Sequence, residues 1–255
     1  MPAPINTFKQ AIQTDRPLFG CWLSLADAGA AEMIGTAGFD WVLIDGEHSP
    51  NDIRSIRDQL SALQASDSPV IVRVPVGETW LIKQVLDVGA QTVMVPMVES
   101  AEQARELVRA CTYPPTGTRG VGATAARAAR FGGIDDYLTT ADEQICLLVQ
   151  VENRAGIANL DEILGVEGVD GVFIGPSDLS TDMGYKGDFA APEVQAVIHD
   201  ALRRIKAAGK SPGVMSLGDL TPGYLDADAQ FIAVAIDVIL MMTAARGSVA
   251  KWKSG

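Results

Sequence analysis

The amino-acid sequence predicts a single (β/α)8 barrel, the TIM-barrel fold, over residues 1–255. Segments with strand character alternate with segments of helical spacing about eight times along the chain, which is the pattern of this fold. The strand segments are apolar without strict alternation, as expected for parallel strands covered on both faces. The length suits one barrel, and no linker or low-complexity segment divides the chain. A doubly wound open sheet is the structural alternative.

The expected strands are short apolar runs that end near a polar residue, a proline or a glycine. They cover Leu18–Leu25, Phe39–Asp45, Pro69–Pro75, Thr92–Pro96, Cys146–Glu152, Gly171–Pro176, Ser211–Ser216 and Gln230–Asp237. The expected helices carry apolar residues three or four positions apart. They cover Ala28–Ala37, Pro50–Gln64, Thr79–Val88, Ala101–Cys111, Ile157–Leu164, Pro192–Ala208, Leu220–Asp226 and Val238–Trp252.

Capping residues predict where two of these helices begin. Ser49 is the expected N-cap of the helix over Pro50–Gln64, and Ser100 with Gln103 forms an expected capping box. The closing segment Val238–Trp252 is apolar enough to pack either on its own barrel or on a partner chain.

Charge and composition exclude several functions. The chain carries a net charge of -12 and 47% hydrophobic residues, so it has a large core but no basic surface for nucleic acid or an anionic membrane. An anionic substrate would need local arginine or a metal. The three cysteines are far apart, which predicts buried, reduced thiols. No apolar leader segment or membrane span is found, so we expect a cytoplasmic protein that acts on a small molecule.

The end of the second expected strand is the first candidate for catalysis. Barrel enzymes place their active sites at the carboxyl ends of the strands. Here the strand runs directly into Asp45, Gly46, Glu47 and His48. A carboxylate three residues before the histidine can orient the imidazole and raise its basicity. The alternative is an exposed loop histidine without a catalytic role.

Two further strand ends carry acidic residues. Glu152 and Asp178 follow neighbouring strands, and two carboxylates without a nearby His or Cys suit a hard divalent ion such as Mg²⁺ or Mn²⁺. The alternative is a structural ion pair for Glu152 and a helix cap for Asp178. Arg73 stands inside an apolar strand and is expected either to bind a substrate oxyanion or to pair with Glu152.

Other polar residues fit less specific roles. His199 lies in the helix over Pro192–Ala208 and is expected to be structural. None of the lysines lies in or at the end of an expected strand, which argues against a Schiff-base mechanism. The long segment Tyr113–Gly133 carries Arg119, Arg127 and Arg130, and its GTRGVG is not a dinucleotide fingerprint.

These motifs together resemble one enzyme family over nearly the whole chain. The most specific are FDWVLIDGEHSPND (39–52), VIVRVP (70–75), GAQTVMVPMVES (89–100), YPPTGTRGVG (113–122), QVE (150–152) and FIGPSDLS (173–180). The chain resembles the metal-dependent pyruvate aldolases of the 4-hydroxy-2-oxoheptane-1,7-dioate and 2-dehydro-3-deoxyglucarate aldolase family. The resemblance implies a barrel of the phosphoenolpyruvate/pyruvate type and a class II aldolase. Such an enzyme cleaves 4-hydroxy-2-oxo acids reversibly to pyruvate and an aldehyde.

The resemblance also implies a role for individual residues. Glu152 and Asp178 would bind the divalent metal, and Arg73 would stabilise the enolate. His48 with Asp45 would form the acid/base dyad. The substrate-binding set would comprise Gln150, Gly175, Ser177, Arg73 and Asp87. Members of the family are typically hexamers with active sites near subunit contacts, so Asp87 would reach a neighbouring subunit's site.

The implied chemistry agrees with the residues. Cleavage of a 4-hydroxy-2-oxo acid leaves negative charge on the 2-oxo oxygen, which a metal and Arg73 can stabilise while His48 accepts the hydroxyl proton. Two rival functions remain. One is a citrate-lyase-like enzyme acting on a coenzyme A thioester, although no basic cluster for its phosphates is evident. The other is a barrel that binds an organic acid without turnover.

Overall fold

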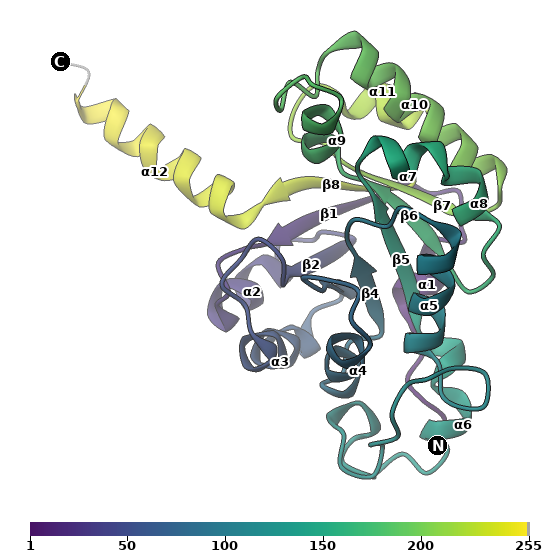
Figure 1. The fold of residues 1–255 in the computed structure, drawn as a ribbon. Coiled ribbons are helices and arrows are strands. Elements are labelled where there is room, and N and C mark those ends of the chain that lie inside the picture. The colour runs from purple at the N-terminus through teal and green to yellow at the C-terminus, as the bar shows by residue number, and fades with distance from the viewer. Residues whose placement is uncertain (254–255) are drawn as a thin grey trace.

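The computed structural model shows a closed barrel of eight parallel strands in sequence order, β1 to β8, and it describes residues 1–253 (Figure 1). The predicted single barrel is confirmed, and the open sheet is wrong. The strands are β1 (Leu18–Leu23), β2 (Trp41–Asp45), β3 (Val70–Arg73), β4 (Thr92–Val95), β5 (Cys146–Val151), β6 (Gly171–Ile174), β7 (Ser211–Met215) and β8 (Phe231–Ile236). Each lies within its expected range, because the last polar residues leave the sheet and enter the loops.

Apart from α1 and α12, the helices surround the barrel and follow the expected order. They are α1 (Thr7–Ala11), α2 (Ala28–Gly35), α3 (Ile53–Ala62), α4 (Thr79–Asp87), α5 (Ala101–Cys111), α6 (Tyr137–Thr140), α7 (Arg154–Ala158), α8 (Leu160–Leu164), α9 (Pro176–Asp182), α10 (Pro192–Ala207), α11 (Thr221–Asp226) and α12 (Asp237–Lys253). Single 3₁₀ turns occupy Leu63–Ala65, Arg127–Ala129 and Asp142–Gln144. The sequence did not predict α1, α6 or α9, and the helix expected over Ile157–Leu164 is two short ones, α7 and α8.

One predicted helix start is wrong. The N-cap of α3 is Asp52, whose side chain accepts hydrogen bonds from the backbone of Arg54 and Ser55. Ser49 instead donates to the Asp45 carboxylate over 3.4 Å, and Asn51 donates to the Asp45 carbonyl over 2.7 Å. These contacts hold the segment before Asp52 as a loop over the barrel mouth, so the helix begins three residues later than expected.

The capping box expected for α5 forms in part. The Ser100 side chain accepts from the backbone of Gln103 as predicted. The Gln103 side chain, however, accepts from the backbone of Glu99 rather than from that of Ser100. The helix therefore begins at the expected residue with one of its two expected caps.

A short N-terminal helix closes the amino-terminal end of the barrel. Phe8 of α1 is fully buried and makes edge contacts with Trp41 at 6.2 Å and with Phe231 at 5.7 Å between ring centroids. These rings fill the interior of the barrel, while a second apolar layer lies between the strands and the surrounding helices. The interior of the barrel at this end is therefore filled with aromatic side chains.

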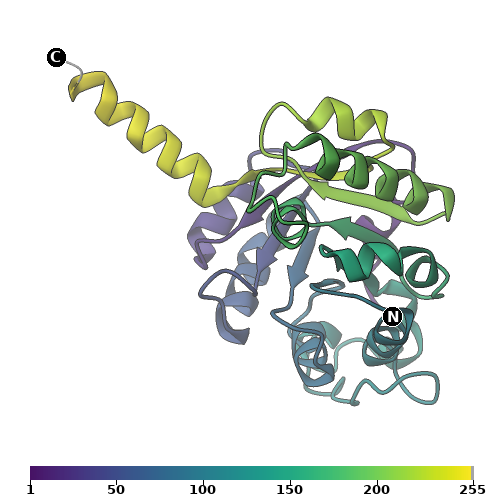
Figure 2. The same cartoon turned by 45° about the horizontal axis from the view of Figure 1, so that its top comes forward.

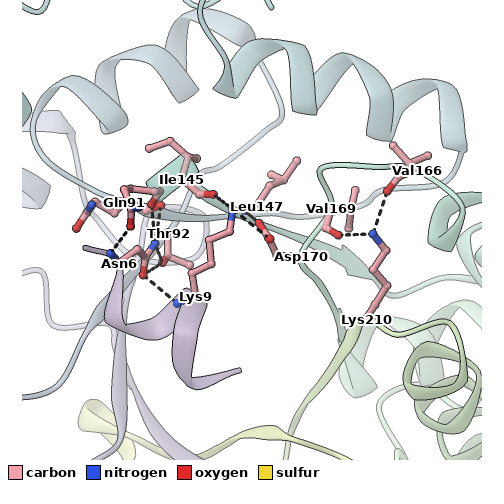
Figure 3. A network of polar contacts seen from close by, with 11 residues as sticks. Asn6, Lys9, Gln91, Thr92, Ile145, Leu147, Val166, Val169, Asp170 and Lys210 are labelled. Carbon is pink, nitrogen blue, oxygen red and sulfur yellow. Dashed lines mark hydrogen bonds and ion pairs between the residues drawn. The ribbon is translucent and has the colours of Figure 1, made fainter. Parts of the chain in front are cut away.

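Polar contacts fasten α1 and the neighbouring loops to the same end, as Figure 3 shows. The Lys9 ammonium donates to the Ile145 carbonyl at 2.7 Å and lies 3.3 Å from the Asp170 carboxylate. Asn6 caps α1 and donates across to Thr92 at 3.0 Å. These charged and polar groups have partners within the chain, so this end has a structural role.

The last helix does not cover its own barrel. Figures 1 and 2 both show α12 running away from the body of the molecule. Its first residue, Asp237, is buried and accepts from the backbone of Ser24 and Leu25. Residues 238–253 are exposed throughout and include Val238, Ile239, Leu240, Met241 and Met242. Of the two predicted alternatives, packing of this helix on its own barrel is therefore wrong.

Two other expectations from composition can be compared with the structure. Cys21, Cys111 and Cys146 are buried and unpaired, as predicted, and burial raises the pKa of Cys21 and of Cys111 to about 12. Within residues 1–253, no helix combines the length and the apolar character that crossing a membrane requires.

Candidate active site

A cavity of about 240 Å³ lies at the carboxyl ends of the strands. Most of the predicted site residues line it. From the ends of β2, β3, β5 and β6 these are Asp45, His48, Arg73, Gln150, Gly175, Ser177 and Asp178. Trp22, Phe173, Met215 and Ile236 add apolar walls. The structure thus brings together side chains that are up to about 130 positions apart in the sequence.

Arg73 is held by two carboxylates that follow β2. Its Nε and Nη2 atoms donate to Asp45 at 2.9 and 2.8 Å, and its Nη1 atom lies 2.7 Å from Glu47 Oε2. The guanidinium also lies over the Trp22 ring, 5.0 Å from the centroid. Burial raises the pKa of Asp45, but the hydrogen bonds and charge of Arg73 outweigh it and hold that pKa below its usual range. The predicted alternative, in which Arg73 pairs with Glu152, is wrong.

The loop that carries these carboxylates depends on a glycine. The backbone N–H of Gly46 donates to the Arg73 carbonyl at 2.8 Å, which turns the chain over the end of β3. A Cβ atom at this position would lie 2.6 Å from the same carbonyl oxygen. Any other residue would therefore push the loop, and with it Glu47, away from Arg73.

His48 is the most exposed of the predicted catalytic residues, with 66% of its side chain accessible. Its Nε2 atom lies 3.8 Å from Glu47 Oε2. Of the hydrogen-bond donors of His48, only the backbone N–H bonds to the Asp45 carboxylate, at 3.4 Å. In the described residues the predicted contact between Asp45 and the His48 ring is absent, and Glu47 is the carboxylate paired with that ring. No role was predicted for Glu47, although its place between Asp45 and His48 was the available signal.

Glu152 is buried beyond the end of β5, with 2% exposure. Its Oε1 accepts the backbone N–H of Met97 at 3.0 Å, and its Oε2 accepts from the Gln150 amide. Met97 has a φ of 54°, a strained conformation for a side chain of its size that aims this N–H at the carboxylate. In the part of the chain that the structure describes, Glu152 forms no ion pair, so the structural ion pair considered for it is not found.

The electrostatic environment of Glu152 favours a bound cation. Burial raises the pKa of Glu152 to about 7, and the negative charges of Asp178 and Glu47 act in the same direction, against the hydrogen bonds from Met97 and Gln150. A cation beside these acidic groups would offset their repulsion and stabilise the ionised form.

Gly175 precedes α9 and lies against Glu152, and Ser177 and Asp178 belong to the first turn of that helix. A Cβ atom on Gly175 would lie 2.3 Å from Glu152 Oε2 and 2.9 Å from the Gln150 amide nitrogen, so only glycine allows this close approach. Gly175 is also the N-cap of α9, hence the alternative role of Asp178 as the helix cap is wrong. Ser177 and Asp178 are exposed on the cavity side of the turn.

The donor set fits a hard divalent ion. Glu152 and Asp178 offer carboxylate oxygens, the ligands that Mg²⁺ and Mn²⁺ prefer. Within residues 1–253, no group of three or more His, Cys, Asp or Glu side chains is arranged to hold a metal. Two protein carboxylates would leave coordination positions open for substrate and water.

Two predicted site residues do not line the cavity: Glu152 lies directly beside the lining residue Gln150, whereas Asp87 lies elsewhere. It is the last residue of α4, a helix that starts after the carboxyl end of β3 and returns toward the amino-terminal end of the barrel (Figure 1). Its carboxylate pairs with Arg119 at 3.0 Å and is 26% exposed. Asp87 is therefore not part of the cavity of its own chain.

The residues expected to lie outside the chemistry do so. His199 packs edge-on against Tyr224, with ring centroids 5.7 Å apart, and is not among the cavity residues. Among residues 1–253, the cavity lining contains no lysine that could form a Schiff base.

Comparison with known proteins decides the family. The model of the HpcH/HpaI aldolase/citrate lyase family matches residues 18–244. The chain belongs to this family. A hydroxypyruvate/pyruvate aldolase from Roseobacter denitrificans is 59% identical over 256 residues, covering 100% of both chains. A 4-hydroxy-2-oxo-heptane-1,7-dioate aldolase from Shigella sonnei is 50% identical and covers 97% of this chain and 95% of its own.

Solved structures agree with this assignment. The crystal structure of a family protein from Burkholderia cenocepacia superposes with a TM-score of 0.92 at 40% identity, covering 96% of this chain and 98% of that one. The resemblance inferred from the sequence motifs is confirmed, and with it the class of carbon–carbon lyases.

Proposed function

We propose that the barrel-mouth cavity cleaves 4-hydroxy-2-oxo acids reversibly to pyruvate and an aldehyde. The observation that carries this proposal is that Arg73, His48 and Asp178 line one cavity of about 240 Å³, while Glu152 lies against two of its lining residues, Gln150 and Gly175. These groups are what such a reaction needs: a cation for a developing oxyanion, a base for a hydroxyl, and carboxylates for a metal. The names of the aldolase relatives point to the same substrate class.

Glu152 and Asp178 would hold a divalent metal, either Mg²⁺ or Mn²⁺. When bound, the ion supplies Lewis-acid polarisation of the 2-oxo group and of the adjacent carboxylate. Gln150, the backbone of Gly175 and the hydroxyl of Ser177 border the same space and would bind the pyruvate carboxylate.

Arg73 would stabilise the enolate. A guanidinium has five N–H groups; two of those of Arg73 donate to Asp45, and its Nη1 atom also forms an ion pair with Glu47. The remaining N–H groups are free for the enolate oxygen, while the two carboxylates and Trp22 fix the plane of the guanidinium. Because this geometry exists before substrate binds, little reorganisation is needed as charge develops.

His48 would move the proton of the 4-hydroxyl group. The imidazole removes that proton, the C3–C4 bond breaks to release the aldehyde, and the electron pair passes to the 2-oxo oxygen. Protonation at C3 then gives pyruvate. The exposed ring of His48 can reach a substrate at the cavity rim, and Glu47 would stabilise the imidazolium form.

The direct test is release of pyruvate from a panel of 4-hydroxy-2-oxo acids, with and without Mg²⁺ or Mn²⁺. Metal-dependent release is expected, and Glu152→Gln should abolish it. Ligand-induced thermal stabilisation without turnover would instead indicate a binding protein. Release of coenzyme A from a thioester would support the citrate-lyase-like alternative, although among the described residues Arg73 is the sole arginine or lysine that lines the cavity.

We further propose that the protein is a homo-oligomer, and by family resemblance a homohexamer. The apolar, exposed surface of α12 supports this, because a second copy would cover it. In such an assembly Asp87 would serve the cavity of a neighbouring subunit. A cytoplasmic location is also proposed, supported by the buried, unpaired cysteines. Sedimentation of a 26.9 kDa particle at micromolar concentration would contradict the oligomer.

A further inference from the structure

We infer that Arg119 is a positioning residue that holds the Asp87 carboxylate in the orientation with which it serves the neighbouring active site. This inference rests on the proposed role of Asp87 between subunits. It also assigns a task to the long segment Tyr113–Gly133, whose function neither the sequence pattern nor the site geometry explains.

Arg119 is buried more completely than a charged side chain normally is. It has 0% exposure, and its guanidinium lies 4.4 Å from the centroid of the Tyr113 ring and 6.0 Å from that of Tyr137. Its Nε and Nη1 atoms have no hydrogen-bond partner, and its Nη2 donates to Asp87 at 3.0 Å. A buried guanidinium with unmet donors costs stability, so general packing does not account for an arginine here. Besides its contacts with the two tyrosines, Arg119 forms one ion pair among the described residues, and that pair is with Asp87.

The carboxylate of Asp87 is held on one side and open on the other. Among the described residues, hydrogen bonds to this carboxylate reach Oδ1 alone, and the side chain stays 26% exposed. Gly122 passes beside the other oxygen, where a Cβ atom would lie 3.4 Å from Oδ2. The glycine lets the segment run close to α4 without a side chain over Asp87. Oδ2 therefore has no hydrogen-bond partner among the described residues, and the partly exposed side chain leaves it available to a group from a second copy.

Backbone contacts fix Arg119 relative to the helices. Its N–H donates to the Thr112 carbonyl at 2.9 Å, and the N–H of Thr118 donates to the Arg109 carbonyl at 2.7 Å. These bonds tie the segment to the end of α5, while Asp87 is the last residue of α4. Arg119 thus connects two helix ends and fixes one rotamer of Asp87, as a supporting residue must for precise positioning.

The first test compares single and double variants in the assembled oligomer. Arg119→Gln and Asp87→Asn should each lower kcat/KM for the hydroxy-oxo acid by about 10- to 100-fold, the usual result of a misplaced catalytic contact. The double variant should be no worse than Asp87→Asn alone, because both changes remove one interaction. Arg119→Lys should restore part of the activity. Arg204→Gln is the matched control, since Arg204 pairs with Asp161 at 2.9 Å on an outer surface, and it should keep full activity.

The second test uses co-expressed, differently tagged variants purified as mixed oligomers. Asp87→Asn mixed with His48→Ala should regain activity, because an intact cavity on one subunit meets an intact Asp87 from the other. Arg119→Gln mixed with His48→Ala should regain activity in the same way. Arg119→Gln mixed with Asp87→Asn should not, because neither subunit then presents a correctly held carboxylate.

The outcomes separate the two proposals. Failure of Asp87→Asn to complement His48→Ala would refute the role of Asp87 between subunits. Success there, combined with failure of Arg119→Gln to complement His48→Ala, would overturn the positioning role alone. Additive losses in the double variant, or dissociation of the Arg119→Gln oligomer in sedimentation, would also overturn it. If Arg119→Gln fails to fold, Arg119→Lys takes its place in both tests, and full activity of that variant would refute the requirement for a planar guanidinium contact.

Discussion

The two ends of the barrel differ in how their charged side chains are paired. At the amino-terminal end the ammonium of Lys210 donates to the Val166 and Val169 carbonyls, and Lys9 contacts Ile145 and Asp170 (Figure 3). Each charge there meets a fixed partner from the chain. At the mouth, Asp45 and Glu47 pair with Arg73, whereas Glu152 has no ion-pair partner among the described residues, and its pKa is raised to about 7, chiefly by burial.

This difference separates a structural network from a functional one. A buried polar network whose members all have hydrogen-bond or ion-pair partners rigidifies the fold. A cluster of carboxylates that lacks a compensating cation instead favours the binding of one. Mutations at the mouth should therefore change the reaction rate and the metal affinity, whereas mutations at the closed end should change the stability of the fold.

The largest expected effect comes from metal removal. Exhaustive chelation should abolish pyruvate release, and Mg²⁺ or Mn²⁺ should restore it, because Glu152 and Asp178 would then lack the cation that their environment favours. Metal affinity should weaken as pH falls below about 7, since a proton competes for Glu152. Calorimetric titration with metal at several pH values measures this, and full activity after chelation would contradict it.

The raised pKa of Glu152 also predicts how the stability of the metal-free protein depends on pH. The folded-state pKa of Glu152, about 7, lies above its usual value of 4.5 because burial disfavours the charge. The folded state therefore binds the proton more tightly than the unfolded state. The stability that this provides is complete below pH 4.5 and is lost as pH rises toward 7. Urea unfolding across this range should show the trend, and Glu152→Gln should remove it.

His48→Ala is expected to have the next largest effect. Aldol cleavage should fall by about 10²–10⁴-fold, the range for loss of a general base. Decarboxylation of oxaloacetate, which has no 4-hydroxyl proton to move, should fall much less. Both rates should be measured on the purified variant at saturating metal. Equal losses in the two reactions would show that His48 acts on the shared enolate or on the metal site.

Arg73→Ala should lower aldol cleavage and decarboxylation together, by about 10²–10³-fold, because both reactions pass through the enolate. Arg73→Lys should recover only part of the rate, since an ammonium cannot match the planar contacts with Asp45 and Glu47. Steady-state kinetics of both reactions test this, with folding checked by circular dichroism. A selective loss of one reaction would contradict a shared role.

The closed end should give the smallest effect on rate. Lys9→Met removes the hydrogen bond to Ile145 and leaves Asp170 without its cation, which should lower the free energy of unfolding by about 1–3 kcal/mol. The kcat/KM value should stay unchanged. Lys206→Met is the matched control, because its partner Asp15 is 95% exposed and the change should stay within about 0.5 kcal/mol. A large loss of rate in Lys9→Met would break the contrast between the two ends.

The sequence predicted the barrel because its strands are apolar on both faces, a signal that does not depend on tertiary detail. It also identified the residues of the mouth, since they follow directly after those strands. It could not identify Glu47 as the partner of Arg73, because that pairing depends on the register that aligns Asp45 with Arg73 in neighbouring strands. The start of α3 was missed for a similar reason, since Asp45 engages Ser49 and Asn51 before a helix can use them.

Asp87 shows a different limit of sequence analysis. The motif that contains it lies at a helix end, and only the fold reveals that this end faces away from the cavity of the same chain. Arg119 lies 32 positions further along, inside a segment without regular spacing, so its contact with Asp87 leaves no local pattern.

The exposed helix α12 has a thermodynamic consequence. If a second copy covers its apolar side chains, unfolding of this protein is coupled to dissociation of the assembly. The melting temperature should then rise with protein concentration, and for a dimeric unit each tenfold dilution should remove about 1.4 kcal/mol of stability per mole of dimer. Truncation before Val238 would make the melting temperature independent of dilution. The concentration dependence of the melting temperature would therefore measure the free energy of subunit association.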